Sequence, residues 1–491
     1  MVAVPVAVNG GRVARNTTYL TLALIGQKIL SALYLPIIAA LIGPTAVGEY
    51  LGALSFINIF AIFIDIGLTT AFIRETARNT ESAPRNYAAV MTFKLLSSVI
   101  VVAALIGTVS YLAAAHHNHP NMVFIEWAAV GMVIDALSTT LYGYFRGLQR
   151  LEYESVGTVL HRVVVMMVGL VALHLGASPV VVIIALVVGS AANFLYGAFH
   201  LWRYGLTWRW EWHWPTMKRL LLLALPFGVA SLFTAIYGNS DNILLTLFQS
   251  HRAVGLYGTA SKIVNAFNVI PAALVAAIFP AMSAAFISDR QRLKHLFTES
   301  MRYLMVAVIP LMVVMITLGH PIILQFYKKL WIDAVWPLRM LALAMPLLFL
   351  NYPIGYLLNA ANRQTQNTVN IAITVIMNII LNVIFIRYFS YRSVAVISVF
   401  SSLQLLLMGL WYVRQVISLP VRELLITLGR TLVAGGLLSG LGWLLLRYTH
   451  SSLGIIAVAL AMTGCYLVLL GALGIIRRRD VYLLVKRLRR S

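Results

Sequence analysis

The sequence is poor in charged residues and in cysteine. Only 11% of its 491 residues are charged and 60% are hydrophobic, whereas soluble proteins carry about 25% charged residues. So few charges cannot cover a surface in water, which excludes a soluble enzyme and a disordered chain. The single cysteine, Cys465, excludes a disulfide framework and a multi-cysteine metal site. Acidic residues are also scarce, since 15 Asp and Glu stand against 37 Lys and Arg, a net charge of +22.

Long apolar runs take the place of the missing charges. A membrane-spanning helix needs about 20 mainly apolar residues, and fourteen segments qualify. They are 17–42, 47–73, 87–113, 122–145, 156–174, 179–201, 219–245, 254–286, 303–325, 334–358, 367–387, 391–413, 423–446 and 453–476. We therefore predict an all-α polytopic membrane protein. No connection is long enough to form an external catalytic domain, so we expect no enzyme.

The basic residues divide unequally between the two sides of the predicted bundle. Of the 37 Lys and Arg, 25 fall in the termini and the connections on their side of the membrane, and six fall in the connections on the other side. Because cytoplasmic connections carry the excess of Lys and Arg, both termini are predicted to be cytoplasmic. The location that follows is the cytoplasmic (inner) membrane, and most of the net charge reports topology.

An internal repeat divides the chain. Residues 46–60 (AVGEYLGALSFINIF) and 253–267 (AVGLYGTASKIVNAF) share seven identities, and they open the second and eighth spans, which run in the same direction. This pattern predicts two pseudo-symmetric six-helix lobes around a central cavity, as in transporters. The expected parts are an N-lobe (1–201), a cytoplasmic linker (202–218), a C-lobe (219–413), two C-terminal spans (414–476) and a basic cytoplasmic tail (477–491).

Some charged residues fall inside the spans, where a charge costs roughly 2.5–3.5 kcal/mol and should face protein or water. Lys28 falls near the middle of the first span. Lys262 shares a helical face with Asn265 and Asn268. We predict that these four residues line a wet cavity. By contrast, residues nearer a cytoplasmic edge are expected to extend toward the surface, namely Lys94, Arg162 and Arg430.

Other polar residues leave two interpretations open. In the second span, Asn58 shares a face with Asp65, which suits a cavity wall. In the eleventh span, Asn378 and Asn382 continue a ladder of polar residues that could line the cavity or bind helices together. Three acids could form structural ion pairs or take part in ion coupling or gating: Asp65, Asp135 and Asp241.

Two stretches resemble a known family. Residues 43–78 (GPTAVGEYLGALSFINIFAIFIDIGLTTAFIRETAR) and 224–263 (ALPFGVASLFTAIYGNSDNILLTLFQSHRAVGLYGTASKI) are similar to the polysaccharide exporters, the Wzx-type flippases of the multidrug/oligosaccharidyl-lipid/polysaccharide (MOP) superfamily. The resemblance implies a MATE-like bundle of fourteen helices that moves undecaprenyl-diphosphate-linked oligosaccharide to the outer leaflet. It implies a role in ion coupling, gating or ligand contact for residues at the matching positions, Asp65, Arg74, Asp241 and Lys262.

The same resemblance implies the partners. These are a lipid-linked glycan, membrane lipids, an H⁺ or Na⁺ gradient and polysaccharide assembly proteins, with the chain itself a monomer. We find no zinc motif, phosphate-cradling glycine loop or nucleophile elbow, so no cofactor and no nucleic acid are expected.

Alternative functions stay open at this point. A flippase for lipid-linked peptidoglycan precursors fits equally well, because its substrate is also a prenyl diphosphate. A MATE-type drug or cation antiporter should have an acidic, aromatic cavity, whereas cations outnumber central acids inside these spans. A membrane glycosyltransferase lacks room for a catalytic domain, and a non-transporting scaffold does not account for a repeat with buried charges.

Overall fold

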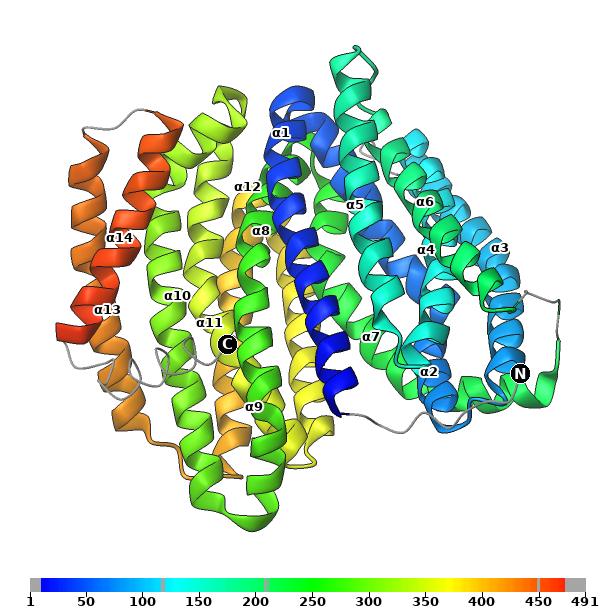
Figure 1. Cartoon of the computed structure of the whole chain (residues 1–491). Helices are drawn as coiled ribbons and strands as arrows, with labels where there is room; N and C mark the ends of the chain where they lie inside the picture. The colour runs from blue at the N-terminus through cyan, green and yellow to red at the C-terminus, as the bar shows by residue number, and fades with distance from the viewer. Residues whose placement is uncertain (1–9, 116–119, 207–209, 211, 448–450, 473–491) are drawn as a thin grey trace. The chain divides into compact units, whose positions relative to one another are not determined.

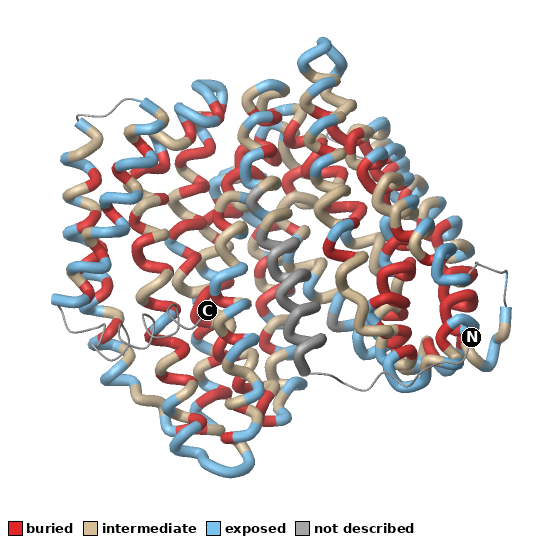
Figure 2. The backbone as a smooth tube through the Cα atoms, in the orientation of Figure 1, coloured by how far each residue is buried: buried red, intermediate tan, exposed pale blue. Residues whose placement is uncertain are grey.

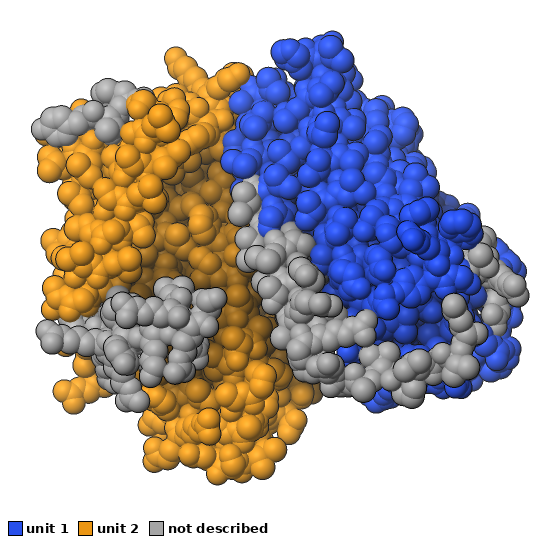
Figure 3. Space-filling model, in the orientation of Figure 1, with its two compact units in different colours: residues 1–255 blue, residues 256–491 orange. Residues whose placement is uncertain are grey.

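A computed structural model describes residues 10–115, 120–206, 210, 212–447 and 451–472. The predicted basic tail (477–491) lies outside this range, as does part of the predicted linker. The described residues form helices and no strands. The chain divides into two compact units, residues 1–255 and 256–491 (Figure 3).

The described residues of unit 1 form seven helices and the first turn of an eighth, which are labelled in Figure 1. They are α1 (Gly10–Asp65), α2 (Leu68–Arg78), α3 (Ala83–Ala115), α4 (Met122–Gly147), α5 (Leu151–His174), α6 (Val181–Arg203), α7 (Trp214–Phe248) and the start of α8 (His251–Asn265). Along individual helices, buried residues alternate with exposed ones (Figure 2). In unit 1, α5 packs against α1 and α6, and α7 packs against α1 and α2.

Unit 2 contains the rest of α8 and the remaining helices. They are η1 (Ala266–Asn268), α9 (Val269–Ser288), α10 (Arg290–Tyr327), η2 (Lys329–Ala334), α11 (Val335–Ala360), α12 (Gln364–Arg414), α13 (Val421–Leu446) and α14 (Ser452–Ala472). In this unit α11 packs against α10 and α12, while α13 and α14 pack against α10.

Two helices each contain two spans. The described residues hold twelve helices that are long and apolar enough to cross a membrane. Within α1 the chain turns back at Gly43 (φ 78°), just before Pro44, and within α12 it turns at Ser390 (φ 53°). Figure 1 shows the ribbon of α1 rising and then returning toward α2. The prediction of an all-α polytopic protein with about fourteen spans is confirmed.

The repeated segments have the same burial pattern. Val47 and its equivalent Val254 are buried, as are Tyr50 and Tyr257. Asn58 and Asn265, also equivalent, are both exposed. The shared pattern follows from the shared sequence, because each copy buries the same apolar face.

The ends of α4 and α11 also correspond. After each helix, the residue directly before an arginine has a positive φ, namely Gln149 (57°) and Asn362 (59°). The backbone N–H groups of Arg150 and Arg363 then bond the carbonyls of Phe145 and Leu358, both at 2.8 Å. The two helices therefore end in a common turn.

A seam of small and polar residues joins α1 to α7 inside unit 1. Asn58 Nδ2 donates to Asn239 Oδ1 at 3.1 Å, and Asn242 Nδ2 donates to Ser55 Oγ at 3.2 Å. Lipid tails are as apolar as the helices, so interhelical hydrogen bonds and close packing hold such segments together. The boundary between the compact units therefore falls after α7. The lobe boundary at 202–218, which was inferred from the repeat, stays a prediction.

Candidate functional site

The candidate site begins where the second predicted span is interrupted. α1 ends at Asp65, Ile66 and Gly67 have positive φ values of 45° and 77°, and α2 follows. A Cβ atom on Gly67 would lie 2.5 Å from the carbonyl oxygen of Ala224, and one on Gly228 would lie 2.7 Å from that of Ile66. α7 thus approaches the break so closely that only glycine fits on both sides. The expectation of one continuous span over 47–73 was wrong.

Asp65 bridges this break. Its Oδ1 accepts hydrogen bonds from the backbone N–H of Thr69 at 3.3 Å and from the hydroxyl of Thr69 at 2.5 Å. Thr69 lies in the first turn of α2, where backbone N–H groups have no partner inside the helix. The carboxylate therefore caps α2 from the end of α1.

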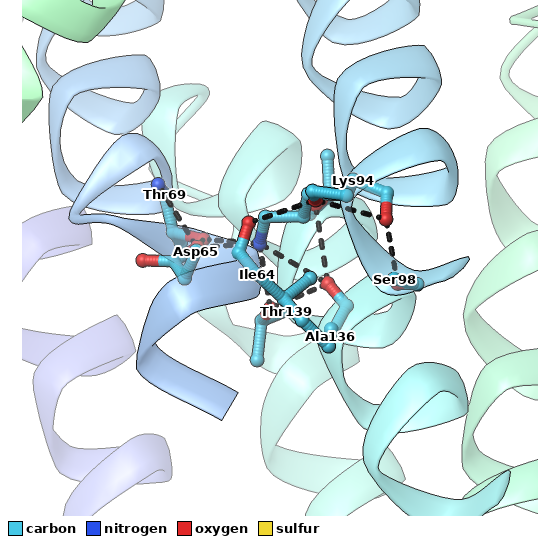
Figure 4. Close-up of polar contacts among 9 residues, drawn as sticks. Ile64, Asp65, Thr69, Lys94, Ser98, Ala136 and Thr139 are labelled. Carbon is cyan, nitrogen blue, oxygen red and sulfur yellow. Dashed lines mark hydrogen bonds and ion pairs between the residues drawn. The ribbon is translucent and has the colours of Figure 1, made fainter. Parts of the chain in front are cut away.

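Lys94 of α3 completes the site (Figure 4). Its Nζ lies 2.5 Å from Asp65 Oδ1. It also donates to the hydroxyls of Thr69 (2.8 Å) and Thr139 (3.2 Å) and to the carbonyl of Ala136 (3.1 Å). The lysine side chain is fully buried, whereas that of Asp65 is 30% exposed. Residues of α1, α2, α3 and α4 thus meet at one ion pair. Its net charge is zero, and only its aspartate, Asp65, is accessible.

The position of Lys94 contradicts the expectation that it extends to the membrane surface. Its depth in α3 would allow that conformation, but acceptors from α1, α2 and α4 surround the ammonium group instead. A buried charge is stable only when it is paired and hydrogen-bonded. In the sequence, Gly67 two residues after Asp65 is a signal for the helix break, but it does not indicate the partners of Lys94.

The two lysines predicted to contact substrate are both exposed. Lys28 lies on α1 in unit 1, and Lys262 lies on α8 in unit 2. After Lys262 the helix tightens into η1. Where α8 passes into η1, the side-chain amide of Asn265 donates to Ser261 Oγ and that of Asn268 donates to Asn265 Oδ1, both at 3.0 Å. A 3₁₀ segment aligns residues three apart, so this polar face is continuous along α8 and η1.

The amide ladder of α12 is buried. Asn382 Nδ2 donates to Asn378 Oδ1 (3.0 Å), and Asn378 Nδ2 donates to Ser401 Oγ (3.3 Å). Two turns earlier on this face, Asn370 Nδ2 donates to the Leu405 carbonyl (2.9 Å). These bonds join the two segments of α12, as the packing interpretation requires. Substrate binding by Asn378 and Asn382 stays a prediction.

The remaining predicted residues lie on three helices of unit 1. Arg74 is exposed on α2, Asp135 is exposed on α4, and Asp241 is half-buried on α7. Next to Arg74, the carboxylate of Glu75 contacts other arginines, Arg78 at 3.5 Å and Arg219 at 3.7 Å. Roles of Arg74, Asp135 and Asp241 in ion coupling or gating stay predictions. Within the described part of the chain, no group of three or more His, Cys, Asp or Glu could hold a metal ion.

Twelve membrane-length helices, an internal repeat and an interrupted helix beside a buried ion pair define a multi-pass membrane transporter. The chain belongs to the polysaccharide biosynthesis protein family, whose model matches residues 13–286. The MatE model matches residues 226–384. Both assign the chain to the MOP superfamily of exporters and flippases, not to the enzymes.

Known proteins are similar to this chain at low sequence identity. An uncharacterized membrane protein of Methanocaldococcus jannaschii is 22% identical over 428 residues, which cover 82% of this chain and 98% of that protein. The structure of the lipid II flippase MurJ in an inward closed conformation has a TM-score of 0.75 at 15% identity, covering 94% of this chain and 99% of that one. An inward-facing MATE multidrug transporter of the MOP superfamily has a TM-score of 0.68 at 17% identity, covering 79% of this chain and 94% of that one.

Proposed function

We propose that this protein is a flippase for an undecaprenyl-diphosphate-linked oligosaccharide. It moves the repeat unit of a polysaccharide from the cytoplasmic to the outer leaflet of the inner membrane by alternating access, with both termini in the cytoplasm. An H⁺ or Na⁺ gradient drives the cycle. Membership of the polysaccharide biosynthesis protein family supports the substrate class.

One observation carries the choice of an anionic ligand. Lys28 and Lys262 are exposed within membrane-length helices, whereas the charge of Asp65 is neutralised by Lys94. A lysine at this depth needs water or a negatively charged or polar partner around its ammonium group, and an anionic ligand supplies such a partner. A diphosphate supplies two negative charges, and each attracts a lysine by about 4 kcal/mol at 4 Å and an effective dielectric of about 20.

The polar faces suit the rest of the ligand. The exposed amides of Asn58 and Asn265 and the half-buried amide of Asn268 provide donors and acceptors for sugar hydroxyls. The prenyl tail stays in lipid, so the protein needs to enclose only the head group. The polysaccharide assembly proteins that deliver and polymerise the repeat unit are the expected partners.

A second candidate is a flippase for lipid-linked peptidoglycan precursors. The structural similarity to MurJ, which covers 94% of this chain and 99% of the MurJ chain, favours this candidate. The same lysines would contact the same diphosphate, and only the glycan differs. A drug or cation antiporter, the third candidate, has the support of the MatE match.

Substitution in a host whose surface glycan depends on this protein tests the proposal. Lys28→Ala and Lys262→Ala should each leave the protein expressed, stop glycan display and cause the lipid-linked precursor to accumulate in the inner leaflet. Lys329→Ala, which removes an exposed lysine at the start of η2, is the matched control and should display glycan normally. Normal display in both test variants overturns the lysine assignment.

Depletion of the protein separates the candidates. An accumulating polysaccharide precursor supports the proposal, an accumulating peptidoglycan precursor supports the second candidate, and accumulation of neither overturns both. Loss of drug resistance without any precursor would identify an antiporter.

A further inference from the structure

Arg162 is a cation inside the membrane without an acidic partner. It lies eleven residues into α5, about 16 Å along the helix axis. None of the ion pairs among the described residues includes it. Of the 15 acids, only Glu211 and Asp480 fall outside the described residues, and neither belongs to a predicted span. Among the described residues of unit 1, no carboxylate therefore forms an ion pair with Arg162.

The head group of Arg162 does not simply reach the surface, as its position in the sequence suggested. Its Nε is buried and has no hydrogen-bond partner among the described residues, while the residue as a whole is half-buried. Arg339, which lies near the start of α11, behaves differently, because its Nε donates to the Ile316 carbonyl at 3.0 Å. The Nε of Arg339 thus has a protein partner, which the Nε of Arg162 lacks among the described residues.

Two tyrosines of α1 lie near Arg162. Tyr34 and Tyr50 are both buried, and each phenol interacts electrostatically with Arg162. The hydroxyl of Tyr34 is buried without a partner in the described structure. It rests against Gly169, where an added Cβ would overlap it. Gly169 lies two turns beyond Arg162 on the same face of α5, so both unsatisfied groups lie on the side of α5 that packs against α1.

Buried polar groups in proteins nearly always have a partner, and an unpaired buried cation is costly. A single kind of ligand satisfies both groups, namely one that carries negative charge and accepts hydrogen bonds. Phosphate oxygens have both properties and match the planar guanidinium. We propose that Arg162, Tyr34 and Tyr50 form a subsite for the phosphate groups of the lipid-linked substrate, in addition to Lys28 and Lys262. The assignment of these phosphate groups to a lipid-linked substrate rests on the proposed flippase function.

Binding to the purified full-length protein in nanodiscs of zwitterionic lipid tests this subsite. The probes are a polyprenyl diphosphate, the uncharged polyprenol and inorganic pyrophosphate. Arg162→Gln should weaken polyprenyl diphosphate binding about tenfold or more, the change expected for the loss of one charge-assisted hydrogen bond. Tyr34→Phe removes only a hydroxyl and should weaken binding about threefold to tenfold. Polyprenol binding should change in neither variant.

Arg339→Gln is the matched control, because it removes an arginine of a membrane-length helix whose Nε has a protein partner. It should bind the diphosphate as the wild type does. Wild-type affinity in both Arg162→Gln and Tyr34→Phe overturns the subsite and leaves the flippase proposal standing. If the wild type binds pyrophosphate through Arg162 but does not distinguish polyprenyl diphosphate from polyprenol, the subsite holds and the lipid-linked source is wrong.

Discussion

Gly48 and Gly255 occupy equivalent positions in the internal repeat and pack reciprocally within unit 1. A Cβ atom on Gly48 would overlap the carbonyl oxygen of His251, and one on Gly255 would overlap that of Pro44. Each contacted residue lies four positions before the other glycine. The two repeat copies therefore cross at equivalent points, and the absence of side chains lets the backbones touch there.

This crossing predicts that alanine is not tolerated. Gly48→Ala and Gly255→Ala should each lower the free energy of unfolding by about 1–3 kcal/mol, because the added methyl group has no space. Gly436→Ala on α13, where no atom lies within 4 Å of the added Cβ, is the matched control and should change stability little. Thermal unfolding in detergent measures all three. Equal transition temperatures for the three variants would contradict the packing.

The ion pair of Lys94 predicts a strong coupling between two substitutions. Lys94→Met leaves the carboxylate of Asp65 without its cation, which should destabilise the protein by about 3–5 kcal/mol. Adding Asp65→Asn removes the stranded charge and should restore part of that stability. A double-mutant cycle of thermal unfolding measures the coupling. If the two effects simply add, the residues do not form the pair seen in Figure 4.

The spans could be predicted from the sequence, because apolar runs of membrane length are visible in it directly. The repeat could be predicted as well, because residues 46–60 and 253–267 share seven of fifteen residues. Depth along a helix also follows from the sequence, which is why Lys28 was recognised as central. The neighbours of Lys94 could not be predicted, since Thr69 and Thr139 lie 25 and 45 residues away and only tertiary packing brings them together. Depth alone cannot tell a lysine that reaches the surface from one that is enclosed.

An amide of α12 and an amide of α8 predict opposite phenotypes. Asn370→Ala removes a buried donor to the Leu405 carbonyl and should cost about 1–3 kcal/mol of stability. Asn265→Ala removes an exposed amide and should leave thermal unfolding nearly unchanged while weakening glycan-lipid binding.

Asn378→Ala and Asn382→Ala then decide the open assignment of the ladder. Reduced stability with unchanged affinity identifies packing residues. Unchanged stability with reduced affinity identifies substrate ligands.

The seam between α1 and α7 predicts a reversible block of transport. Cys465 is the only cysteine, so Cys465→Ala gives a background without thiols. Asn58→Cys with Asn239→Cys should crosslink with a short bifunctional thiosulfonate, because the native side chains are 3.1 Å apart. Each single-cysteine variant is a control and should not crosslink within the chain.

The crosslink also distinguishes two mechanical roles of the seam. Alternating access requires parts of the bundle to move against each other. If α1 and α7 separate during the cycle, the crosslinked protein should stop transport and a reductant should restore it. Undiminished transport by fully crosslinked protein would mean that α7 moves as one body with α1, so that the moving boundary lies beyond α7, where the compact units divide.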